Sequence, residues 1–173
     1  MEKTDYKKHR WFFTSSGKLV IGGKNAEDNE KIVSQVKDDE TVLHTKTAGS
    51  PFVNIKNSAG ILNAQESDSK KISDIKGKAK KKDIKEAAIF CAKYSKAWKQ
   101  NREDIEVHVF NGKDIFKEKD MKLGTFGVKK IKKLIVKKQD ILNFQEKKEE
   151  KEFGSLKRKM SGQEFKDIAR KGW

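Results

Sequence analysis

The stretch that most constrains the fold is LVIGGKNAEDNEKIV, at 19–33, where a run of strand-forming apolar residues meets two glycines and a helix start. Asn25 has the side chain of a good helix N-cap, and Asp28 places a carboxylate in the first turn. Apolar residues then recur at helical spacing as far as Val36. The stretch predicts a strand, a tight turn and a helix over about 26–36, so the fold must combine both kinds of element.

Further apolar segments add strands and one longer helix. Strand-type runs flank the turn signal SSGK within 10–23 and recur at 41–45, 51–57, 105–110, 124–128 and 131–136. We expect the last two runs to pair with each other around a basic turn. Apolar residues at helical spacing predict a helix from 84 to about 100, with Cys91 and Trp98 on its buried face. The predicted class is α+β, with a mixed or antiparallel sheet and two main helices.

The polar segments divide the chain into regions. Residues 1–8 are expected to form a flexible arm, and 9–138 the folded domain, interrupted by a long lysine-rich and serine-rich loop at 63–82. The remainder, 139–173, is predicted to be a charged C-terminal tail, in which the last thirteen residues can form one short capped helix.

Composition favours a polyanionic partner. Only 34% of the 173 residues are hydrophobic, which suits one modest core, and the formal net charge is +15. Nucleic acid and an anionic membrane both match this charge, but no basic amphipathic helix with a broad apolar face supports the membrane. The sequence has no apolar run of the roughly 18 residues that a membrane span needs, and no signal peptide at its start. We expect a cytoplasmic protein that does not bind membranes.

Motifs for catalysis or for a cofactor are absent from the sequence. The segment GGKN at 22–25 lacks the Lys-Ser/Thr pair of a P-loop and the third glycine of a dinucleotide fingerprint. Three histidines and one cysteine have no metal-ligand spacing. His44 could act as a general base, although no nucleophile partners it in the sequence. We therefore expect no catalytic residue, no metal and no cofactor. A strand-to-helix turn is the simplest interpretation of the two glycines, which also suit close approach, positive φ and phosphate contact.

Four segments in order resemble one family. HRWFFTSSGKLVIGGKNAEDNEKIV, LHTKTAGSPFVNIKN, DIKEAAIFCAKYSKAW and GTF are similar to the segments of the NFACT-R domain, also called DUF814, over roughly 9–136. This is the RNA-binding domain of NFACT proteins, which include ribosome-quality-control and fibronectin-binding-like members. Full-length relatives carry further domains, so the resemblance implies a stand-alone, archaeal-type member. It implies binding of structured RNA, tRNA or rRNA, in translation or ribosome-associated quality control.

The resemblance also suggests which residues shape or contact the RNA. They are Gly22, Gly23, Lys24, Asn25, Asn29, His44, Lys46, Gly49, Ser50, Lys56, Asn57, Lys96, Lys129, Lys130, Lys132 and Lys133. Two other functions stay open. The chain could be an enzyme or accessory subunit in tRNA modification or processing, with His44 as acid or base. It could also be a protein-docking scaffold that acts through its C-terminal tail.

Overall fold

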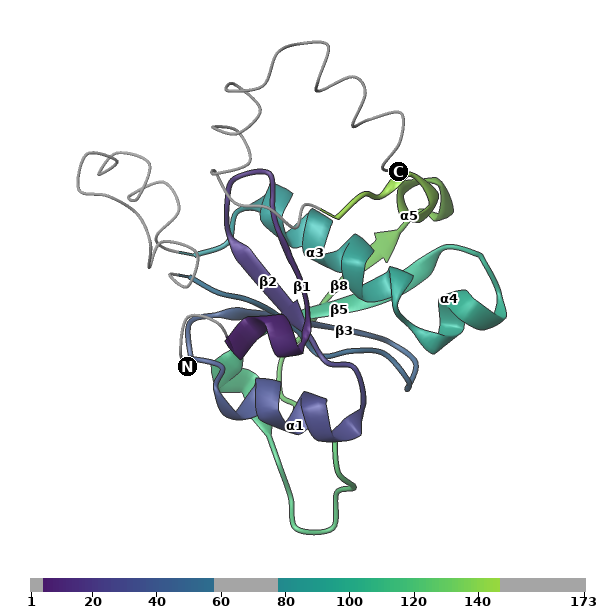
Figure 1. Cartoon of the computed structure of the whole chain (residues 1–173). Coiled ribbons are helices and arrows are strands. Elements are labelled where there is room, and N and C mark those ends of the chain that lie inside the picture. Colours follow the sequence, from purple (N-terminus) through teal and green to yellow (C-terminus); the bar gives the residue numbers. More distant parts are fainter. Residues whose placement is uncertain (1–4, 58–77, 147–173) are drawn as a thin grey trace, which may run out of the picture.

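The computed structural model describes residues 5–57 and 78–146, which are built around a six-stranded sheet (Figure 1). Its strands lie in the order β1 (Arg10–Phe13), β2 (Leu19–Gly22), β4 (Val53–Ile55), β3 (Thr41–Thr45), β5 (Ile105–Asn111) and β8 (Lys132–Val136). Each neighbouring pair is antiparallel. Two short strands, β6 (Ile115–Phe116) and β7 (Gly127–Val128), form a separate antiparallel ribbon. The prediction of an α+β fold with an antiparallel sheet is confirmed.

Helices cover both faces of the sheet (Figure 1). The helices in the described residues are α1 (Ala26–Ser34), α3 (Lys81–Lys93), α4 (Lys96–Gln100) and α5 (Lys138–Asn143), with 3-10 turns η1 (Asp5–Lys8) and η4 (Gly112–Asp114). Because side chains alternate along a strand, Leu43 of β3 packs in the core beneath α3 while Val42 packs with residues of α1. None of the described helices is long and apolar enough to cross a bilayer.

Local signals explain the first half of the fold. The β1–β2 hairpin closes at the predicted SSGK turn, where Gly17 takes the left-handed φ of 94° that glycine adopts without strain. Asn25 caps α1 as expected, since its side-chain oxygen accepts a hydrogen bond from the Asp28 amide at 2.9 Å. Ile32 of α1 is fully buried and packs against Ile21 of β2.

Two predictions about elements are wrong. The helix expected over 84–100 is divided, because α3 ends at Lys93 and Ser95 caps α4 through a hydrogen bond from the Trp98 amide at 3.2 Å. Both pieces pack on one core, so the apolar spacing continues across the break. The runs at 124–128 and 131–136 do not pair with each other, since β7 pairs with β6 and β8 pairs with β5.

The folded region also extends beyond the expected bounds. The described part of the predicted arm forms η1, whose Tyr6 ring packs edge-on against Trp11 at 5.1 Å between centroids. At the other end, α5 buries Ile141, and Phe144 packs edge-on against Phe12 in the core at 5.4 Å. The start of the predicted tail therefore packs on the core of the domain. Most of the expected loop at 63–82 and the tail from 147 onward lie outside the described residues.

Candidate nucleic-acid interface

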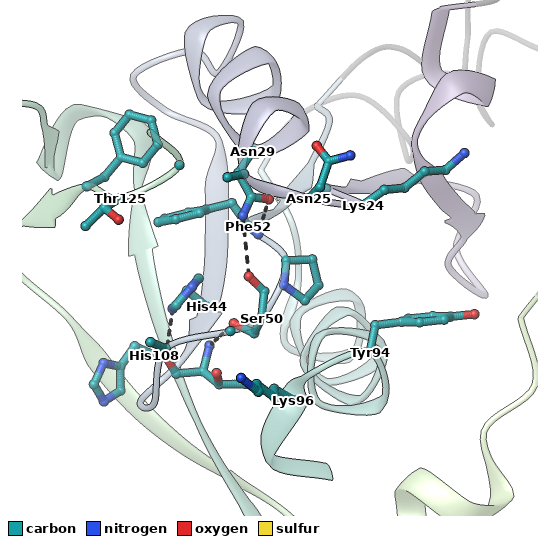
Figure 2. A pocket seen from close by; sticks show the side chains of 18 of the residues that line it. Lys24, Asn25, Asn29, His44, Ser50, Phe52, Tyr94, Lys96, His108 and Thr125 are labelled. Atoms are coloured by element: carbon teal, nitrogen blue, oxygen red, sulfur yellow. Dashed lines mark hydrogen bonds between the residues drawn. The ribbon is translucent and has the colours of Figure 1, made fainter. Parts of the chain in front are cut away.

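A cleft of about 760 Å³ opens where the start of α1, the β3–β4 connection, the start of α4 and the β6–β7 ribbon meet. Figure 2 shows Thr125 on one side and Lys24 and Tyr94 on the other, with His44, Ser50 and Phe52 between them and Lys96 below Ser50. The predicted site residues that line this cleft are Gly23, Lys24, Asn25, Asn29, His44, Lys46, Gly49, Ser50 and Lys96. The fold therefore brings together residues that lie far apart in the sequence.

The two glycines serve close packing inside the protein. A Cβ added to Gly23 would lie 1.9 Å from Asn29 Oδ1, and one added to Gly22 would lie 3.0 Å from the Phe90 ring. Asn29 occupies this space because its Oδ1 accepts a hydrogen bond from the Phe52 amide at 3.0 Å. Neither glycine has a positive φ, so both positions require glycine because no room is left for a side chain. Asn29 thereby ties α1 to the segment that enters β4.

The N-terminus of α1 already holds an anion. The carboxylate of Asp28 accepts a hydrogen bond from the Lys24 amide at 3.0 Å and contacts Nδ1 of the buried His9 at 2.7 Å. A carboxylate at this end is stabilised by the helix dipole. The Lys24 ammonium is exposed and makes no ion pair within the described residues, so the lysine side chain is the group free to meet a phosphate.

The β3–β4 connection is fixed from both ends. The Ser50 hydroxyl accepts a hydrogen bond from the Thr45 amide at 3.1 Å, and the Gly49 carbonyl accepts one from the Lys96 amide at 2.7 Å. Gly49 has a φ of +91°, and its Cβ would lie 3.0 Å from that of Lys96. This turn therefore requires glycine, and it holds the start of α4 beside the cleft.

His44 is a neutral hydrogen-bonding group within the cleft. Its Nδ1 donates to the Thr45 carbonyl at 2.7 Å, since a carbonyl oxygen can only accept, and this leaves Nε2 as an acceptor. The ring packs against Phe52 with centroids 4.4 Å apart. Burial lowers the pKa of His44, because removal from water penalises the charged imidazolium. Across the strands His44 lies opposite His108, which lies opposite Lys133.

The charge of the cleft has one sign. Its described lining includes Arg10, Lys24, Lys46, Lys96 and Lys99 but no Asp or Glu. The four lysines are exposed and form no ion pair within the described part of the chain. Arg10 lies deeper, where its guanidinium donates to the Gly23 carbonyl at 3.0 Å and stacks 4.7 Å from the centre of the Tyr94 ring. Such a lining attracts phosphate, and its aromatic side chains can contact bases.

Comparison with known proteins bears on the family and on the fold. The model of the NFACT protein RNA-binding domain family matches residues 8–130. The chain belongs to this family. A solved C-terminal structure of the fibronectin/fibrinogen-binding protein from Streptococcus suis has a TM-score of 0.57 at 20% identity, and the match covers 75% of this chain and 45% of that one. That likeness supports the fold of the NFACT RNA-binding domain described above. Comparison with curated proteins gives no match.

Some residues expected in the RNA interface of this NFACT domain lie elsewhere. Lys56 is buried, its ammonium pairs with Glu40 at 2.7 Å, and it does not line the cleft. The Asn57 amide donates to the same carboxylate at 3.1 Å. Gly22 is buried behind the cleft rather than lining it.

The basic segment after β7 only borders the cleft. Lys129 and Lys130 are exposed but do not line it. Lys133 shares a sheet face with His108, whereas Lys132 pairs with Val109 and points to the opposite face. The lysines of this segment therefore do not form one continuous surface, although Ile131 between them lines the cleft.

The cleft also contains residues that sequence reasoning missed. They are Arg10, Phe52, Tyr94, Lys99, His108 and the side chains of 123–131 that face it. His108 and Glu106 lie two positions apart in a strand, so the sequence pattern could have suggested a contact between them. In the structure, Nε2 of His108 lies 2.9 Å from the Glu106 carboxylate. The ribbon residues gave no such signal, because their contribution depends on where the β6–β7 ribbon packs.

Cys91 and Trp98, two side chains that could take part in chemistry or binding, are core residues. Cys91 is fully buried, and burial raises its pKa to about 12, so its thiol stays protonated at pH 7. Within residues 5–57 and 78–146, no three His, Cys, Asp or Glu side chains are placed to hold a metal ion. Trp98 is buried in the core as predicted, with Arg102 over its ring at 5.6 Å.

Proposed function

We propose that this NFACT RNA-binding domain is a non-catalytic module that binds tRNA or rRNA through the cleft, and that it acts in the cytoplasm on the translation machinery or in ribosome-associated quality control. The family supports RNA as the partner. The choice of tRNA or rRNA, and of the process, rests on the resemblance of its motifs to NFACT proteins. The observation that carries the proposal is the cleft lined by cations without a carboxylate.

The charge arrangement supports this cleft over other basic surfaces of the molecule. Two lysines outside the cleft, Lys117 and Lys93, are instead paired with Glu30 at 2.7 Å and with Glu146 at 3.4 Å. Phosphate contacts by unpaired lysines release counterions, so they supply affinity that falls steeply with salt. Backbone hydrogen bonds hold the β3–β4 connection against α4, so little order must be created on binding.

The test is a fluorescence-anisotropy titration against tRNA, an unstructured RNA of equal length and duplex DNA, across a salt series. We expect tighter tRNA binding that persists at higher salt. The variant Lys24→Ala/Lys46→Ala should lose about tenfold or more in RNA affinity with an unchanged melting temperature. The matched control, Lys31→Ala/Lys85→Ala, removes the same charge from exposed positions outside the cleft and should lose much less. Equal losses for the two pairs would contradict the proposed interface.

A further inference from the structure

One part of the cleft lining, the apolar wall, is formed by residues within 123–131 and carries mostly apolar side chains. Leu123 and Ile131 are 56% and 40% exposed, and both line the cleft together with the half-buried Phe126 and Val128. Exposed side chains of this size usually mark a contact surface when they cluster, although single ones need no explanation. Here they come from one short segment that lines a basic cleft.

This apolar wall is fixed to α1. Glu30 of α1 accepts hydrogen bonds from the Gly124 amide at 2.8 Å and from the Lys117 ammonium at 2.7 Å. Gly124 has a φ of +79°, and a Cβ there would lie 2.7 Å from Ala26 Cα. Lys117 also donates to the Thr125 carbonyl at 2.8 Å and lies over the Phe126 ring. The wall is therefore a built part of the cleft, and the lysine beside it is neutralised by Glu30.

Building on the RNA-binding function proposed above, we propose that the cleft holds one unpaired nucleotide that is splayed out from a loop or an end of a structured RNA. Its phosphates lie along Lys24, Lys46 and Lys96, and its base lies against the apolar wall formed by Leu123, Phe126, Val128 and Ile131. The neutral His44 lies between the two walls and offers Nε2 to a base N–H group.

The two-sided lining explains why the base must be unpaired. A nucleotide carries an anionic phosphate and an apolar base face, which match the two walls. In a duplex the base faces are stacked on each other, so the duplex presents phosphates and sugars but nothing for the apolar wall. A volume of about 760 Å³ falls in the range of ligand pockets, and it admits a splayed nucleotide rather than a helix. A protein partner would use the apolar wall but would leave four facing lysines without a defined role.

The test compares one short fluorescent RNA as a single strand and annealed to its complement, at fixed salt. The variant Leu123→Ser/Ile131→Ser removes the apolar wall. Its matched control is Ile135→Ser/Leu142→Ser, which changes a similarly exposed pair, 50% and 48%, that does not line the cleft. Melting temperatures confirm that all variants are folded. A second readout is the emission of 2-aminopurine placed in the single strand, which reports unstacking of that base.

We expect the wild-type protein to prefer the single strand. The cleft variant should lose about tenfold in affinity for the single strand, little for the duplex, and the 2-aminopurine response. The control variant should keep all three. Equal binding of both RNA forms, with the cleft variant matching its control, would overturn this inference. The RNA-binding function would still stand if Lys24→Ala/Lys46→Ala loses affinity in the same assay. If every variant, including Lys24→Ala/Lys46→Ala, keeps its affinity for both RNA forms, that result would count against the proposed function itself. Retained single-strand binding together with loss of a protein partner in the cleft variant would assign the wall to protein docking and overturn the inference.

Discussion

The two ends of the β3–β4 pair show how differently the same residue can be used. Lys46 follows the last residue of β3, and Lys56 follows the last residue of β4. Because the strands are antiparallel, their last residues lie at opposite ends of the strand pair, and so do the two lysines that follow them. Lys46 is exposed and lines the cleft, whereas Lys56 is buried against Glu40. Lysine after a strand is therefore informative only once the facing carboxylates are known.

The difference separates stability from binding. Around Lys56, the Glu40 carboxylate accepts from the Lys56 ammonium at 2.7 Å, the Lys37 backbone amide at 3.0 Å and the Asn57 backbone amide at 3.1 Å, so this cluster holds the turn at 37–40 against the end of β4. Lys46 forms no ion pair within the described residues, and Glu106, whose charge interacts with it, does not line the cleft. Changes at the first end should lower the free energy of unfolding, and changes at the second should lower affinity for RNA.

The largest effect should come from Glu40→Ala. Removing one partner of a buried ion pair leaves the Lys56 ammonium buried without compensation, which costs about 3–5 kcal/mol in the free energy of unfolding. Urea denaturation measures this loss. The double variant Glu40→Ala/Lys56→Met should recover most of it, because no buried charge then remains. As a control, Asp104→Ala removes a carboxylate from an exposed pair and should cost about 1 kcal/mol or less. A similar small loss for Glu40→Ala would show that the buried pair is not what stabilises this end.

Gly23→Ala should have the next largest effect. The new Cβ would displace Asn29, so that the buried Phe52 amide loses its acceptor, at a cost of about 1–3 kcal/mol. If the clash is the cause, the double variant Gly23→Ala/Asn29→Ala should cost less than the sum of the two single variants. Chemical denaturation of the four proteins measures this coupling. Strict additivity would mean that Gly23 acts through something other than Asn29.

Lys46→Ala and Lys56→Ala test the comparison directly. Lys46→Ala should weaken RNA binding several-fold and lower the salt slope by about 0.7–0.9 if the lysine contacts one phosphate, with an unchanged melting temperature. Lys56→Ala should lower the melting temperature, and the protein that stays folded should bind RNA as before. Salt-dependent anisotropy and thermal unfolding of the same two samples provide the data. An exchange of these two outcomes would reverse the roles that the structure gives to the two lysines.

Local signals predicted much of the fold and part of the site. The Asn25 cap, the turn between β1 and β2 and the helical spacing around Cys91 each depend on residues close in sequence, and each is confirmed. The helix break at Ser95 could not be predicted from the apolar spacing, because that spacing continues across the break. The cluster of lysine, histidine and glycine residues around the cleft was expected from the resemblance to NFACT-R rather than from the pattern.

Contacts between distant segments were beyond local reasoning. The ion pair of Lys56 joins residues sixteen positions apart through the turn of a strand pair. The β6–β7 ribbon depends on Glu30, which contacts Gly124 across ninety-four positions. No periodicity in either segment reveals its partner, so the apolar wall of the cleft emerged only from the folded arrangement.

The smallest expected effect is the pH dependence of the free energy of unfolding that His44 contributes. Burial holds the pKa of His44 below its ordinary value of 6.5, so the unfolded chain takes up a proton at His44 before the folded one does. The stabilising contribution is therefore complete above about pH 6.5 and is lost as pH falls through the lowered pKa. Urea denaturation across pH 5–8 should show stability falling on the acid side, with a shallower fall for His44→Gln. RNA affinity should carry no step from His44 between pH 6.5 and 8, because the ring is neutral throughout. A step there that disappears in His44→Gln would show that the imidazole is protonated in the cleft and contacts phosphate as a cation.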